Sequence, residues 1–155
     1  MCFQISGLDV DQFSHLFGED LETLSKSGVE RMIVDNKPGY PCRVSLQDAD
    51  IGDTVLLMNY EHQPALSPYR SSHAIFVREW AIQTKPARNE VPEMLRHRMI
   101  SLRAFDSSGM MVDADIVDGR QIEPMIDRML AIESVSYLHL HNAKRGCYAA
   151  RVDHA

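Results

Sequence analysis

The stretch RMISLRAFDSSGMMVDADIVDG (98–119) predicts two strands joined by the short loop Ser-Ser-Gly. Gly109 supplies the left-handed residue that the third position of such a loop favours. The segment that follows, RQIEPMIDRMLAIES (120–134), predicts a helix because its apolar residues recur at helical spacing. These apolar residues are Ile122, Met125, Ile126, Met129 and Leu130. A hairpin followed by an amphipathic helix is therefore expected in this part of the chain.

Most other predicted elements are strands that follow one another without a helix between them. The predicted strands cover residues 3–8, 29–35, 42–46, 54–62, 73–83, 135–142 and 147–153. Two short helices are predicted near the N-terminus, over 9–17 and 18–28. This order favours an α+β fold with a mainly antiparallel sheet of about eight short strands and one longer helix near 120–133. We expect residues 1–155 to form a single domain.

Composition and charge narrow the class of protein. Apolar residues make up 45% and charged residues 25% of the 155 residues, which is typical of a fold with its own core. The net charge of −6 argues against nucleic-acid binding, although a local basic pocket would suit a small anion. Three widely spaced cysteines form no disulfide framework, and no segment has the pattern of a signal peptide or membrane helix. We therefore expect a cytoplasmic protein with free thiols and no membrane contact.

Five segments of the chain carry a resemblance to a known family. They are PGYPCRVSL, GDTVLLMNYEHQ, SPYRSSHAIFVRE, RMISLRAFD and LHNAKRGCYAARVD. In this order, and over nearly the whole chain, the sequence resembles the bacterial domain-of-unknown-function family 1203. The resemblance implies one complete domain. It implies no reaction, cofactor or catalytic residue, because none is assigned to that family.

The segment YLHLHNAKRGCYAARVD (137–153) predicts a closing hairpin with a polar face. Residues two apart on a strand face the same way, so His139 and His141 share one face, and Leu138 and Leu140 share the other. The leucines are expected to face the core.

The length of the hairpin loop determines where Cys147 points. A four-residue loop would pair Cys147 with Asn142 and turn the thiol to the leucine face. A three-residue loop, Lys144 to Gly146, would turn it to the histidine face and set His139 opposite Arg151. A glycine at the third loop position favours the three-residue loop, and a one-residue error reverses the conclusion.

Two chemistries fit a histidine face with a thiol. In the first, Cys147 is a nucleophile and His141, or His62 from an earlier strand, is the acid or base. In the second, His139 and His141 chelate a metal ion and need a third ligand. Candidates for the third ligand are His62, His73 and Asp153.

A second group of polar residues could hold an anion. The loop in MNYEHQPALSPYRSSH (58–73) presents Tyr69 and Arg70, and the guanidinium of Arg70 suits a carboxylate or a phosphate. An exposed loop, with Arg70 paired to a surface carboxylate, is the alternative. Arg43, Asn142 and Arg145 complete the ligand-binding residues that we expect.

Three functions remain open at this point. The first is a small enzyme or binding protein that holds a small anionic metabolite in a pocket of histidine, arginine and cysteine. The second is an interaction module that forms a homodimer through the histidine face, where Tyr137 and Tyr148 would suit an interface. The third is a metal-binding protein of the His-x-His type. The sequence names no cofactor and leaves open whether the protein is an enzyme.

Overall fold

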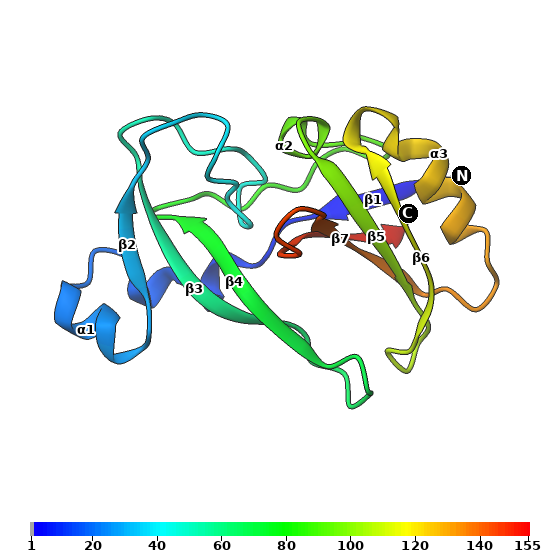
Figure 1. Cartoon of the computed structure of the whole chain (residues 1–155), viewed down its shortest axis with the longest axis horizontal. Helices are drawn as coiled ribbons and strands as arrows, with labels where there is room; N and C mark the ends of the chain where they lie inside the picture. Colours follow the sequence, from blue (N-terminus) through cyan, green and yellow to red (C-terminus); the bar gives the residue numbers. More distant parts are fainter. Residues whose placement is uncertain (1) are drawn as a thin grey trace.

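Two antiparallel sheets lie side by side in the computed structural model, which describes residues 2–155 (Figure 1). The larger sheet contains, in spatial order, β1 (Phe3–Ser6), β8 (Tyr148–His154), β7 (Tyr137–Asn142), β5 (Met99–Phe105) and β6 (Met111–Asp118). The smaller sheet contains β2 (Glu30–Ile33), β3 (Thr54–Gln63) and β4 (Ser71–Arg78). The helices are α1 (Leu21–Lys26), α2 (Glu93–Arg96) and α3 (Ile122–Leu130), with 3-10 turns at η1 (Val10–Gln12), η2 (Ser14–Leu16) and η3 (Gly119–Gln121). The predicted α+β class is confirmed, with the strands divided between two sheets.

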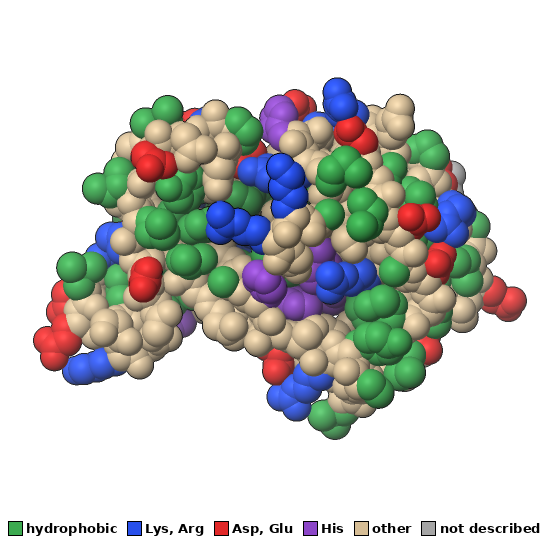
Figure 2. Space-filling view, viewed as in Figure 1, with side chains coloured by type: hydrophobic (Ala, Val, Ile, Leu, Met, Phe, Trp, Pro, Cys, Tyr) green, Lys and Arg blue, Asp and Glu red, His purple; other side chains and the backbone are tan. Residues whose placement is uncertain are grey.

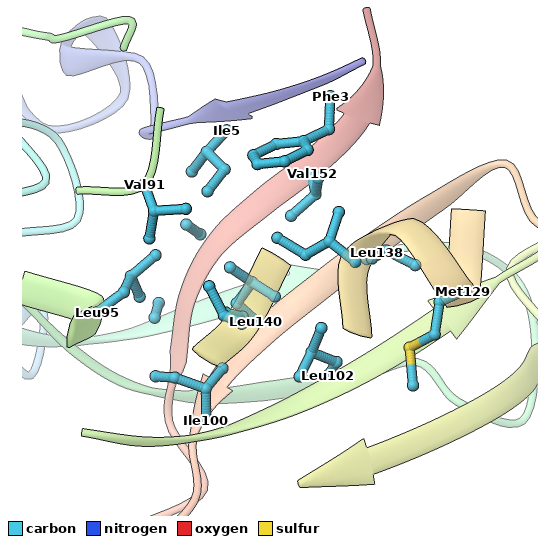
Figure 3. Close-up of a cluster of buried hydrophobic side chains, with 14 of the residues drawn as sticks. Phe3, Ile5, Val91, Leu95, Ile100, Leu102, Met129, Leu138, Leu140 and Val152 are labelled. Atoms are coloured by element: carbon cyan, nitrogen blue, oxygen red, sulfur yellow. The ribbon is translucent and has the colours of Figure 1, made fainter. Parts of the chain in front are cut away.

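The predicted hairpin and helix at 98–134 form one side of the main core. β5 and β6 pair antiparallel, and α3 covers the larger sheet (Figure 1). Ile126 and Met129 of α3 pack with Leu102, Leu138 and Leu140 of the sheet, all of them almost fully buried (Figure 3). The leucine face of the last hairpin therefore lies in this core, as its spacing predicts.

The smaller sheet builds a second core against the N-terminal segment. Leu56, Ile75 and Val77 are buried and pack with Leu24 of α1 and Phe13 beside η1. Each core buries the apolar face of one sheet. The histidine face of β7 therefore lies between the two sheets.

Two predicted elements differ from the structure. The helix predicted over 9–17 is a pair of 3-10 turns, and the Asp9 side chain caps the first of them. The strand predicted over 42–46 is absent from the described residues, where Pro41 and Cys42 form only isolated bridges. This segment instead turns around the buried side chain of Arg43, which donates to the backbone carbonyls of Pro41 and Tyr148.

Within residues 2–155, the helices are too short or too polar to cross a membrane.

Candidate metal centre and basic cleft

Three buried histidines come together between the two sheets. His139 and His141 lie on the same face of β7, and His62 reaches them from β3 of the smaller sheet. The pairing of β3 with β4 is irregular between Tyr60 and Gln63, next to His62. Such a bulge re-aims a side chain. Figure 2 shows histidine side chains grouped at the middle of this face of the molecule, with Lys and Arg side chains beside them.

The spacing of the three imidazoles suits one metal ion. One ring nitrogen from each histidine lies within 4.8 Å of the other two. Three atoms at most 4.8 Å apart have a common centre no more than about 2.8 Å from each of them, and a zinc–nitrogen bond is about 2.0–2.1 Å long. Small side-chain rotations would close that difference. Among the residues that the structure describes, these three histidines are the one group with this property.

Each of the three rings carries a buried nitrogen without a hydrogen-bond partner in the described structure. These atoms are Nδ1 of His62, Nδ1 of His139 and Nε2 of His141, on side chains that are 8%, 3% and 0% exposed. Leaving a buried polar atom unpaired costs about 1–3 kcal/mol, and most proteins leave few of them. Three such atoms from three converging rings therefore indicate a ligand.

The second nitrogen of His141 has a fixed role. Its Nδ1 donates a hydrogen bond to the carbonyl oxygen of Gly146 at 2.9 Å. A carbonyl only accepts, so the proton lies on Nδ1 and the lone pair lies on Nε2. Histidine ligands of metals usually have this arrangement, because the outer hydrogen bond fixes the tautomer and the ring orientation.

The three histidines are neutral at ordinary pH. Burial lowers the pKa of His62 to about 4 and the pKa values of His139 and His141 to about 3. A smaller part of the lowering comes from the positive charge of Arg103, which acts on all three rings. Neutral imidazoles are metal ligands, whereas an acid or base that works near pH 7 needs a pKa near 7.

Aromatic rings hold the imidazoles in place. Tyr148 stacks on His62 with ring centroids 5.7 Å apart and an interplanar angle of 10°. Phe105 and Tyr137 pack against His139 at 5.1 and 5.2 Å. These contacts restrict the rings to small movements.

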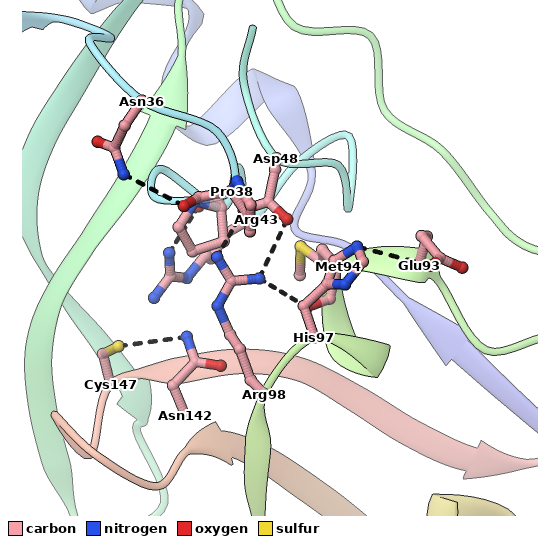
Figure 4. A network of polar contacts seen from close by, with 11 residues as sticks. Asn36, Pro38, Arg43, Asp48, Glu93, Met94, His97, Arg98, Asn142 and Cys147 are labelled. Atoms are coloured by element: carbon pink, nitrogen blue, oxygen red, sulfur yellow. Dashed lines mark hydrogen bonds and ion pairs between the residues drawn. The ribbon is translucent and has the colours of Figure 1, made fainter. Parts of the chain in front are cut away.

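A second site, the basic cleft, lies at the end of the same hairpin. It is a cleft of about 710 Å³ formed by the β7–β8 loop, the segment at 36–43 and the start of β5 (Figure 4). The polar residues that line it include Arg43, Arg98, Asn142, Lys144, Arg145 and Cys147. Within residues 2–155, none of its lining residues has a carboxylate. An excess of positive charge therefore faces this cleft in a protein of net charge −6.

Two arginines form the inner wall of the basic cleft. Arg43 is 1% exposed and donates to the carbonyl oxygens of Tyr148 at 2.7 Å and Pro41 at 2.6 Å. Arg98 is held by an ion pair with Asp48 at 2.6 Å (Figure 4). Arg43 has no carboxylate partner among the described residues, and burial lowers the pKa of its guanidinium.

The hairpin loop differs from the three-residue loop that we predicted. Asn142 donates its backbone N–H to the carbonyl oxygen of Cys147, and Gly146 donates to Asn142. The loop therefore has four residues, with Gly146 in the left-handed conformation at the fourth position. The predicted pairing of His139 with Arg151 is correct, because the register shifts by one residue between Leu140 and His141.

The shift separates the thiol from the histidines. Cys147 lies in the basic cleft, where the side-chain amide of Asn142 contacts its sulfur at 3.5 Å. The prediction that Cys147 shares a face with His139 and His141 is wrong at this turn. A nucleophile activated by His141 therefore has no support from the described contacts.

The remaining predicted residues divide between the two sites and the surface. Arg43, Asn142 and Arg145 line the basic cleft together. Tyr69 and Arg70 do not line it, and Arg70 is exposed and pairs with Glu61 at 3.0 Å. The structure favours the alternative that we left open for this loop, which is an exposed loop with a surface ion pair.

Of the three residues that we considered as a third ligand, one lies with His139 and His141. His62 joins the cluster, whereas His73 lies outside it and Asp153 pairs with Arg151 at 2.7 Å. Sequence reasoning missed Arg103 on β5, although a charged residue between Leu102 and Ala104 in an apolar strand was a usable signal.

The comparisons with known proteins identify the family. Residues 39–154 match the family model described as "Protein of unknown function (DUF1203)", and the chain therefore belongs to this family. The resemblance inferred from the sequence is confirmed. The matched range includes His62, Arg103, His139 and His141. No curated protein and no solved structure matches the chain.

Proposed function

We propose that this member of the DUF1203 family binds one divalent transition-metal ion through His62, His139 and His141. The observation that carries the proposal is that one nitrogen from each of these three buried rings lies within 4.8 Å of one from the other two. Each ring also has a buried nitrogen without a hydrogen-bond partner within residues 2–155, which a bound ligand would satisfy. Of the three functions that the sequence left open, metal binding of the His-x-His type is thus the best supported.

The donor set favours some ions over others. Three imidazoles without a carboxylate suit Zn²⁺, Fe²⁺, Ni²⁺ or Cu²⁺, whereas Mg²⁺ and Ca²⁺ prefer oxygen ligands. Structural zinc sites use four protein ligands, and sites with three keep a position for water or substrate. A three-histidine site is therefore one at which a second molecule can bind the metal.

The proposal is tested by titrating the metal-free protein with Zn²⁺ in a calorimeter. One ion per chain is expected, and His141→Ala should weaken its binding by about 100-fold or more. His73→Ala is the matched control, because His73 lies on the neighbouring strand β4 outside the cluster. An unchanged affinity in His141→Ala, or no binding to the natural chain, would overturn the proposal.

The basic cleft supports a second function, the binding of a small anionic molecule. Lys144 and Arg145 are exposed at its rim, and Arg43 is buried in its wall without a carboxylate partner in the described chain. Guanidinium and ammonium groups bind carboxylates and phosphates. Oδ1 of Asn142 is buried and without a partner in residues 2–155, which offers an acceptor to a hydroxyl of the same ligand.

A phosphate titration followed by NMR tests this second function. Chemical-shift changes are expected at Lys144 and Arg145, and the double variant Lys144→Gln/Arg145→Gln should weaken binding about 10-fold. Arg70→Gln, which removes an exposed charge outside the cleft, is the control. Equal phosphate binding by the double variant and the natural chain would contradict anion binding in the cleft.

The homodimer alternative was based on an exposed histidine face of the last hairpin, and this face is buried. His139, His141 and Tyr148 are all buried within the chain. The histidine face packs against the smaller sheet, and this burial gives no support to a homodimer formed through it.

A further inference from the structure

Arg103 lies on the strand that pairs with the one carrying His139 and His141. It is on β5, and the register of the larger sheet sets it opposite His139. Residues opposite each other on neighbouring strands project to the same side of the sheet. Its positive charge contributes to the lowered pKa values of His62, His139 and His141.

Arg103 differs from the other arginine that flanks His139. Arg151, opposite His139 on β8, pairs with Asp153 and lies 4.0 Å above the ring of Tyr137. Arg103 is half-buried and has neither an ion pair nor a hydrogen bond in the described residues. A partly desolvated guanidinium without an anion is an unfavourable arrangement, because a buried charge is normally paired.

The metal ion would increase this imbalance. Three neutral imidazoles leave the full charge of a divalent ion, and the cluster contains no carboxylate to offset it. Together with Arg103 the site would hold a charge of about +3 in a partly buried place, whereas Arg151 and Asp153 cancel each other. An anion from solution is the remaining means of balancing this charge.

We infer that the metal held by His62, His139 and His141 binds a small oxyanion, and that Arg103 binds the same anion from β5. This inference rests on the proposed metal site and names the class of molecule that completes it. One oxygen of a carboxylate or phosphate would occupy the open coordination position. A second oxygen would accept from the guanidinium, whose planar fork suits both groups.

The experiment uses the Co²⁺-loaded full chain, because the visible absorption of Co²⁺ reports changes in its ligands. Acetate and, in a separate titration, inorganic phosphate are added while the spectrum is recorded. A saturable change with either anion is expected, and the stronger of the two identifies the preferred oxyanion. Arg103→Gln should weaken this anion binding about 10-fold or more and leave Co²⁺ affinity within about 3-fold.

Two further variants separate a direct role of Arg103 from a structural one. Arg103→Lys keeps the charge but loses the fork, and should bind the anion with intermediate affinity. Arg128→Gln removes an exposed arginine on α3 and should behave as the natural chain.

The outcomes distinguish this inference from the metal proposal. Failure of the natural chain to bind Co²⁺ overturns both. Normal Co²⁺ binding with no spectral response to either anion, or with an equal response in Arg103→Gln, overturns only the role of the anion and Arg103.

Discussion

His141 donates its Nδ1 hydrogen to the carbonyl oxygen of Gly146, five residues later in the chain, at 2.9 Å. This bond joins the three-histidine cluster to the loop that lines the basic cleft. The same loop therefore sets the tautomer of His141 and carries Lys144 and Arg145. A change in the loop is expected to alter the proposed metal site, although no loop residue belongs to the histidine cluster.

Gly146→Ala tests this connection. Gly146 has a φ of 79°, and open space surrounds the position of an added methyl group, so the cost is conformational. We expect a loss of about 1–2 kcal/mol in the free energy of unfolding and about a 10-fold loss of Zn²⁺ affinity. Urea unfolding and calorimetric titration measure the two effects.

Gly28→Ala is the matched control for that variant. Gly28 has a φ of 67° and equally open surroundings, but it follows α1, far from the cluster in sequence. It should lose a similar amount of stability and keep its Zn²⁺ affinity. Equal losses of Zn²⁺ affinity in the two variants would show that the bond to His141 has no special role.

The buried histidines predict how the stability of the metal-free protein depends on pH. Their folded pKa values, about 4 for His62 and about 3 for His139 and His141, lie below the unfolded value near 6.5. Below pH 6.5 the unfolded chain therefore binds protons that the folded chain does not, and stability falls as the pH falls. The loss is on the order of 1 kcal/mol per pH unit for each histidine that stays neutral.

Urea unfolding at pH 7.5, 6.0 and 5.0 measures this dependence. His141→Gln should reduce the slope between pH 6 and pH 5, and Arg70→Gln, at an exposed ion pair, should not. A free energy of unfolding that stays constant from pH 7.5 to pH 5.0 would contradict the burial of neutral histidines.

Cys147 lies in the basic cleft and outside the histidine cluster. Its side chain is 9% exposed and lines the cleft with Lys144 and Arg145. Saturating phosphate is therefore expected to slow its alkylation by iodoacetamide, measured by mass spectrometry of the peptide. Removing the metal with a chelator should leave the rate unchanged.

The exposed Cys2 is the internal control for that experiment, because it lies outside the cleft. Phosphate should not protect it. Alkylation of Cys147 that responds to the chelator and not to phosphate would place the thiol with the histidines, contrary to the loop that we describe.

Arg43 stabilises the fold in addition to lining the cleft. Arg43→Met would leave the carbonyls of Tyr148 and Pro41 without their buried donor. We expect a loss of about 2–3 kcal/mol in the free energy of unfolding. Arg70→Met, at an exposed ion pair, should change it by less than about 0.5 kcal/mol. Similar values for the two variants would show that the buried hydrogen bonds of Arg43 contribute little.

The parts of the fold that depend on local pattern could be predicted from the sequence. The period of two along 137–142 correctly separates His139 and His141 from Leu138 and Leu140, and the helical spacing after residue 120 correctly predicts α3. These patterns report which side chains face the apolar core.

Features that depend on distant contacts could not be predicted in the same way. The loop before Cys147 gains a residue because the β7–β8 register shifts at His141, and nothing in the local sequence marks that shift. The turn at Arg43 forms because its side chain binds a carbonyl of Tyr148, 105 residues away. The choice of His62 as the third histidine likewise depends on how the two sheets pack.

X-ray absorption at the zinc edge of the Zn²⁺-loaded protein tests the metal site most directly. We expect three imidazole nitrogens and one oxygen at about 2.0–2.1 Å from the ion, with no sulfur. A sulfur at about 2.3 Å would place a cysteine on the metal, and fewer than three imidazoles would exclude the cluster of His62, His139 and His141. Either result would contradict the account.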